Sequence, residues 1–216
     1  MPTRREPRRR SNTGVPARAP TPPTLLTWVL LFLAGTATAL APGAHVADFT
    51  LTDATGTPHE LYALSAKKAV VIMTQSNGCP IVRLAVPALR ELRDRYPKQD
   101  IEFLLLNPTL QDSAKTVREE AAEFKFGLPV MLDPTQKVGE ALGVNRTAEV
   151  YVIDPKSWTL VYHGPIDDRL NYETQRPVQH RYLSDALDEM LAGKSIAVAS
   201  ASSPGCLINF PNRKHG

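Results

Sequence analysis

The pattern of hydrophobic and polar positions along this chain predicts a mixed α/β domain. Two short apolar runs, at 69–74 and 101–106, are typical of strands buried in the centre of a sheet. Between them, residues 81–95 place apolar side chains on one face of a helix, with charged residues in the intervening positions. Pro87 lies within this helical pattern, and we expect it to kink the helix.

Shorter elements are expected on both sides of this centre. Ser113 is placed to cap a helix over 114–125, and Glu120 is expected to point outward from that helix. The other expected elements are a β-hairpin of 47–53 with 59–64, a strand at 128–133, a short helix at 134–142, a hairpin of 150–153 with 159–162, and a helix at 180–191. The order of these elements predicts a central mixed sheet with an N-terminal β-hairpin and helices on both faces.

Residues 1–39 have the composition of a secretory signal peptide with a basic lead. The first 18 residues contain six arginines and one glutamate, and the apolar run 25–33 follows them. Small residues then end in Ala39, after which we expect cleavage. The protein is therefore predicted to be exported to the periplasm or the extracellular space. If the segment 25–40 is not cleaved, it would anchor the protein to a membrane instead.

Composition places one domain in the rest of the chain. The 216 residues are 43% hydrophobic, which suffices for a single core, and we assign this domain to 44–192. Residues 193–216 are expected to form a mobile tail that carries Cys206. The overall charge of +3 arises from the +5 of the first 18 residues, so the remainder is slightly acidic and shows no sign of binding nucleic acid.

Cys79 is the main candidate for chemistry. It follows the apolar strand 69–74 and a polar turn, and Pro80 after it is suited to the first position of a helix. A thiol at a helix N-terminus is stabilised as the thiolate by the helix dipole and by free backbone N–H groups. Cys206 is the only other cysteine, and in an oxidising compartment the two sulfurs can form a lasting disulfide.

At three places the chain resembles redoxins, the alkyl-hydroperoxide-reductase/thiol-specific-antioxidant group of the thioredoxin fold. The opening hairpin 47–53, the strand and helix around Cys79-Pro80, and the stretch 150–154 carry the resemblance, which covers about residues 44–192. It implies a thioredoxin-like fold and an exported thiol-dependent oxidoreductase with peroxiredoxin-like, antioxidant activity. Cys79 would attack a peroxide or a protein disulfide, Cys206 or an external thiol would resolve the product, and an external thiol would act as reductant.

The chain departs from the patterns of this superfamily at four positions. Val82 replaces the second cysteine of the Cys-x-x-Cys motif, so no local dithiol can form. Ile72 and Ser76 stand where peroxiredoxins carry proline and threonine, and Ser76 still offers a hydroxyl to a peroxide. Ala148 occupies the position of the thioredoxin cis-proline or the peroxiredoxin arginine, and Arg146 lies two residues away. We therefore add Ser76 and Arg146 to the two cysteines as candidate catalytic residues.

Two other functions stay open at this point. One is a disulfide-exchange protein that uses a single cysteine, and the other is a non-catalytic redoxin-like module that binds a partner or handles a metal. Exported copper-handling relatives use a Cys-x-x-x-Cys motif, but here Arg83 stands at its second cysteine. The five histidines show no close ligand spacing either, so no metal and no cofactor is predicted. Arg169 is expected to fix the loop at 167–169 by pairing with a carboxylate.

Overall fold

The computed structural model describes residues 1, 3, 40–98, 100–170 and 175–211 of the chain. The chain divides into two compact units, Met1–Gly35 and Thr36–Gly216, and the described residues from 40 onward belong to the second. Apart from Met1 and Thr3, the predicted signal peptide lies outside the described residues. Within the described part of the chain, no helix has the length and apolar character needed to cross a membrane.

A five-stranded sheet forms the centre of the domain, in the order β5-β4-β3-β6-β7. The strands are β3 (Ala69–Thr74), β4 (Ile101–Asn107), β5 (Val130–Leu132), β6 (Val150–Asp154) and β7 (Thr159–Gly164). Strand β3 is parallel to β4 and antiparallel to β6, so the predicted mixed sheet is confirmed. All six residues of β3 are buried, as their apolar character predicts for a central strand covered on both faces.

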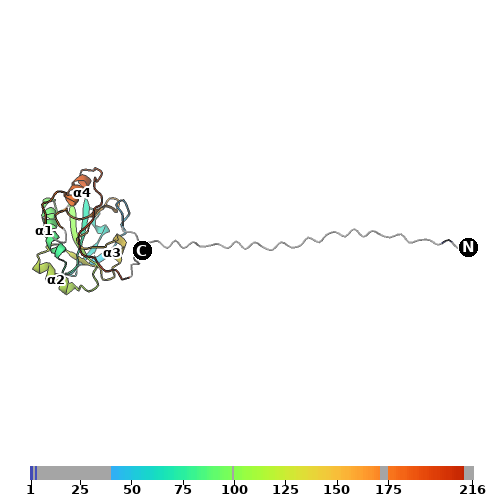
Figure 1. Cartoon of the computed structure of the whole chain (residues 1–216), viewed down its shortest axis with the longest axis horizontal. Helices are drawn as coiled ribbons and strands as arrows, with labels where there is room; N and C mark the ends of the chain where they lie inside the picture. The colour runs from blue at the N-terminus through green and yellow to red at the C-terminus, as the bar shows by residue number, and fades with distance from the viewer. Residues whose placement is uncertain (2, 4–39, 99, 171–174, 212–216) are drawn as a thin grey trace. The chain divides into compact units, whose positions relative to one another are not determined.

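Helices cover both faces of this sheet. They are α1 (Pro80–Arg95), α2 (Ala114–Glu123), α3 (Lys137–Leu142) and α4 (Tyr182–Leu191). Apolar residues of α1, α2 and α4 share one buried cluster, whereas Leu142 of α3 belongs to a second cluster with Tyr151 of β6. In Figure 1, α1 and α2 lie side by side, and α3 lies apart from them. Pro87 lies inside α1 without ending it.

The N-terminal hairpin is present with shorter arms than predicted. It consists of β1 (Thr50–Thr52) and β2 (Pro58–Glu60), and the chain then forms the 3₁₀ helix η1 (Tyr62–Leu64). The carboxylate of Asp53 accepts hydrogen bonds from the backbone amides of Thr55 and Thr57 and bonds to His59 across the turn. Burial disfavours the charged form of Asp53, but these hydrogen bonds outweigh it and lower the pKa to about 2.

The segment after α4 contacts the domain, although the sequence suggested a mobile tail. Its backbone bonds to His163 of β7 through Ala199 and Ala201. Farther along, the Phe210 side chain is only 2% exposed and lies within the apolar cluster around α3. The described part of this C-terminal segment, residues 193–211, therefore belongs to the folded domain. Its long-range attachments bring Cys206 back to the sheet.

Candidate active site at the Cys79–Cys206 pair

Cys79 occupies the N-cap position of α1, directly after the turn that follows β3. Its backbone is extended, with φ −76° and ψ 113°, and Pro80 begins the helix as predicted. The amide of Cys79 donates to the carbonyl of Ser76, which closes the turn. The residue is only 4% exposed. The sequence and the structure thus agree that Cys79 caps a helix that begins at Pro80, and the structure adds that the residue is buried.

Two carboxylates hold the turn before Cys79. The amide of Asn77 donates to Asp112 at 2.9 Å, and the amide of Gly78 donates to Glu120 at 2.7 Å. Glu120 also accepts from Arg83 at 3.0 Å, and its side chain is buried. The expectation that Glu120 points outward is therefore wrong, because this carboxylate accepts from a turn amide that would otherwise lack an acceptor.

Cys206 lies opposite Cys79, with 2.8 Å between the two Sγ atoms. The C-terminal segment reaches this position by pairing antiparallel with the loop before β6, at Arg146 and Leu207. The amide of Thr147 donates to the carbonyl of Cys206 at 2.9 Å, and the amide of Ile208 donates to that of Asn145 at 2.9 Å. The backbone, and not only the sulfur contact, therefore fixes where Cys206 lies.

Thr147 is a site residue that sequence reasoning missed. Its hydroxyl lies 3.0 Å from the Sγ of Cys79 and accepts the amide of Cys206 at 2.8 Å, so a single oxygen contacts both cysteines. Its neighbour Ala148 has a positive φ of 55°, which is uncommon for a residue other than glycine. The only sequence signal for Thr147 was its place beside the departure at Ala148.

Gly205 permits the close approach of the C-terminal segment. A Cβ atom at this position would lie 1.6 Å from the carbonyl oxygen of Thr147 and 2.5 Å from its carbonyl carbon. Both contacts are with backbone, which cannot rotate away as a flexible side chain can. Any larger residue at position 205 would therefore push Cys206 away from Cys79.

Arg146 and Ser76, the other two predicted site residues, make backbone contacts near the two cysteines. The guanidinium of Arg146 donates through Nη1 to the carbonyl of Gly205 at 2.9 Å, so it helps to hold the C-terminal segment. Ser76 contributes its backbone carbonyl to the turn before Cys79. The structure places the hydroxyl of Thr147 beside the sulfur.

The two sulfurs have opposite electrostatic surroundings. Burial raises the pKa of Cys79, but hydrogen bonds from Cys206, Thr147 and the amide of Val82 outweigh it and leave the pKa lowered. For Cys206, burial and the neighbouring Cys79 thiolate both raise the pKa. In the reduced state, these surroundings favour negative charge on Cys79 over negative charge on Cys206.

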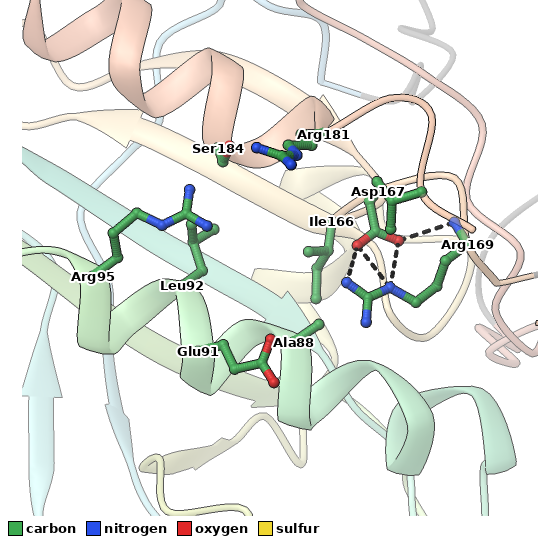
Figure 2. Close-up of a pocket in the computed structure, with 10 residues that line it drawn as sticks. Ala88, Glu91, Leu92, Arg95, Ile166, Asp167, Arg169, Arg181 and Ser184 are labelled. Atoms are coloured by element: carbon green, nitrogen blue, oxygen red, sulfur yellow. Dashed lines mark hydrogen bonds and ion pairs between the residues drawn. The ribbon is translucent and has the colours of Figure 1, made fainter. Parts of the chain in front are cut away.

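A cleft of about 230 Å³ lies between α1 and α4, and neither cysteine lines it. Figure 2 shows the guanidinium of Arg169 bonded to Asp167 at the edge of this cleft. Its Nη2 and Nε donate to Oδ2 of Asp167 at 2.9 and 3.0 Å. The predicted role of Arg169 in fixing its loop is thus confirmed. A smaller hollow shares this edge and extends to Ala148 and Pro204, which neighbour the cysteine site along the chain.

The mixed sheet and its flanking helices have the thioredoxin-like fold, and two thiols meet at the N-terminus of α1. The AhpC/TSA family model matches residues 42–162, more than half of the chain, and the chain belongs to this family.

One similar protein is named for a redox activity. The thiol-disulfide oxidoreductase ResA of Geobacillus thermodenitrificans is 29% identical over 117 residues, which make up 54% of this chain and 66% of that protein. The chain thus spans slightly less than two thirds of this curated relative.

Two solved structures extend the comparison. A hypothetical protein from Sinorhizobium meliloti is 28% identical with a TM-score of 0.72, over 81% of this chain and 97% of that one. The thioredoxin domain of a thiol-disulfide oxidoreductase from Bacteroides vulgatus shares the fold, with 16% identity and a TM-score of 0.55 over 70% and 98% of the two chains.

Proposed function

We propose that this protein is a thiol–disulfide oxidoreductase whose redox-active pair is Cys79 and Cys206. The observation that carries the proposal is the 2.8 Å contact between their Sγ atoms at the N-terminus of α1. A disulfide needs about 2.05 Å between the sulfurs, so a small side-chain movement suffices to form the bond. Family membership and the similarity to ResA support the same activity.

The proposed cycle moves two electrons between the pair and an external partner. When a partner disulfide is reduced, the two cysteines lose two electrons and two protons and form one S–S bond, and the partner gains two thiols. An external thiol reductant then reverses the change in the protein. The hydroxyl of Thr147 and the amide of Val82 stabilise Cys79 whenever it carries negative charge.

Reduction of peroxide is the second candidate. A Cys79 sulfenic acid, formed when the thiolate takes one oxygen from a peroxide, would arise next to Cys206, which would displace water and close the disulfide. We favour disulfide exchange because Ile72 and Ala148 stand where peroxiredoxins carry a proline and an arginine. Arg146, the nearest arginine along the chain, donates to the Gly205 carbonyl.

We also propose that the protein is exported. Support comes from the basic lead, the apolar run 25–33 and the small residues ending in Ala39. N-terminal sequencing of the protein from the producing cells tests this: a mature chain beginning at position 40 agrees, and an intact N-terminus in a cytoplasmic fraction contradicts it. In an oxidising compartment, the disulfide would persist until a dedicated thiol reductant opened it.

The activity is tested with the reduced protein and two oxidants, glutathione disulfide and hydrogen peroxide. A loss of two hydrogens by intact mass, with no maleimide uptake and a Cys79–Cys206 peptide, supports the dithiol cycle. Turnover of a disulfide substrate with dithiothreitol should be lost in both Cys79→Ser and Cys206→Ser. Rapid oxidation by peroxide alone would favour the second candidate, and two unoxidised thiols with both reagents would contradict both.

A further inference from the structure

The two sulfurs of the proposed disulfide differ in how an outside molecule can reach them. Cys79 is 4% exposed and belongs to the apolar cluster that packs α1 against the sheet. Cys206 is partly exposed, and the next residue, Leu207, is 73% exposed. The C-terminal segment therefore covers Cys79 and presents Cys206 at the surface.

The geometry of thiol–disulfide exchange makes the exposure of each sulfur determine which one an outside thiolate attacks. An attacking thiolate approaches the sulfur that it bonds to from the side opposite the leaving sulfur, so that three sulfurs lie nearly in a line. Attack on Cys206 takes place at a partly exposed residue, which packs against the edge of the apolar cluster and is not buried within it. To attack Cys79, a thiol would have to approach from the side away from Cys206, toward the core to which Cys79 belongs.

The surroundings of the leaving sulfur favour the same choice. If Cys206 is attacked, Cys79 leaves as a thiolate that accepts hydrogen bonds from the hydroxyl of Thr147 and the amide of Val82, at the N-terminus of α1. If Cys79 were attacked, Cys206 would have to carry the charge on an irregular segment, outside any helix N-terminus.

The backbone of the segment stays in place through this step. Cys206 is held by its bonds to Thr147, and Ile208 by its bond to Asn145, and none of these depends on the S–S bond. The cysteine that is attacked is therefore presented in a fixed orientation, and opening the disulfide does not require the segment to leave the domain.

We propose that the oxidised protein is reduced by attack of a partner thiolate on Cys206, so that the mixed disulfide forms on Cys206 and Cys79 is released. In this step a bond forms between the partner sulfur and Cys206 Sγ, the Cys79–Cys206 bond breaks, and Cys79 takes the electron pair. A second partner thiol then attacks the first partner sulfur, which yields the partner disulfide and frees Cys206. This inference depends on the proposed function, because it assigns a direction to that cycle.

The experiment uses the full oxidised chain and reduced glutathione as the probe thiol. Samples are quenched in acid at a series of short times, free thiols are alkylated with maleimide, and peptides are mapped by mass. Extrapolation to zero time removes any later transfer of glutathione between the two cysteines. At zero time, we expect the amount of glutathione on Cys206 to be about ten times the amount on Cys79 or more, with maleimide on the Cys79 of the same molecules.

The same reaction in urea is the matched control, because both sulfurs are then equally accessible. The ratio of glutathione on Cys206 to glutathione on Cys79 should fall to about one in the unfolded protein. A zero-time product on Cys79, equal labelling of the two cysteines, or a preference unchanged by unfolding would overturn the inference while leaving the dithiol cycle intact. Failure to form the starting disulfide would instead reject the proposed function, and the inference with it.

Discussion

Adding one methyl group at residue 205 should separate the two cysteines without changing either of them. In Gly205→Ala, the new Cβ would start 1.6 Å from the Thr147 carbonyl oxygen, whereas a real contact needs at least 3.0 Å. The C-terminal segment must therefore move outward from the loop before β6. This movement strains or breaks hydrogen bonds between residues 205–208 and residues 145–147, among them four that measure 2.8 to 2.9 Å.

The size of the effect follows from those bonds. Each contributes about 1 kcal/mol net, so losing two or three of them costs about 2 to 3 kcal/mol. At about 1.4 kcal/mol per tenfold, the disulfide should become less favourable by a factor of about 30 to 150. The measurement is the equilibrium between dithiol and disulfide forms in glutathione buffers of known composition.

Ser202→Ala is the matched control, because this exposed residue of the same segment changes without adding atoms. It should leave the equilibrium constant within a factor of about two of the parent, as exposed substitutions usually do. Hydrogen exchange of the Cys206 and Ile208 amides provides a second readout, and in Gly205→Ala both should lose protection. An unchanged equilibrium constant together with protected amides would refute the reasoning, because the methyl group would then have been accommodated without moving the segment.

Three further outcomes are expected. Thr147→Val removes the hydroxyl beside the Cys79 sulfur, so the pKa of Cys79 should rise and its alkylation near neutral pH should slow. Thr109→Val is the control, because the buried hydroxyl of Thr109 has no hydrogen-bond partner among the described residues, and it should leave the alkylation rate unchanged. Glu120→Gln weakens the charged bonds to the turn and should lower the free energy of unfolding by about 1 to 3 kcal/mol in urea titrations, against less than about 0.5 kcal/mol for the exposed Glu119→Gln. The pKa of Asp53 in the folded protein is about 2, below its ordinary 3.8, so its contribution to the free energy of unfolding is complete above pH 3.8 and is lost as the pH falls through about 2. The free energy of unfolding of Asp53→Asn should therefore fall less between pH 5 and pH 2 than that of the parent, and an identical pH dependence would contradict this.

Local signals in the sequence were enough for most of the fold. The strand at 69–74 has the predicted bounds, because five consecutive apolar residues followed by Thr74 and a polar turn have few alternatives to a buried central strand. The start of α1 at Pro80 and the helix cap at Ser113 were also predicted, since helix caps depend on side chains within a few residues. Glu120 was misplaced even though it lies three residues after the buried Val117, a spacing that puts both on one helix face.

Long-range contacts explain what the sequence did not predict. Thr147 is polar and sits in a loop, and nothing near it in sequence indicates that it contacts two cysteines 68 and 59 residues away. The attachment of the C-terminal segment depends on Phe210 entering the cluster around α3 and on the close approach at Gly205. Such contacts depend on how distant segments are brought together by the fold. The spacing of hydrophobic residues within a single segment therefore cannot predict them.

Val82 supplies no local second thiol, and the register of an isolated antiparallel bridge places Cys206 beside Cys79 instead. In an antiparallel pair, neighbouring residues point to opposite sides, so a shift of one residue moves a side chain to the other face. The pairing of Arg146 with Leu207 sets Cys206 beside Thr147, and the same register gives the Thr147 hydroxyl contact with both cysteines. A one-residue slip of the C-terminal segment would turn the Cys206 sulfur away from Cys79 and bring a side chain other than glycine to the crowded Thr147 carbonyl. The segment is thus held in one register by sterics as well as by hydrogen bonds, and that register is what places the second thiol within bonding reach of the first.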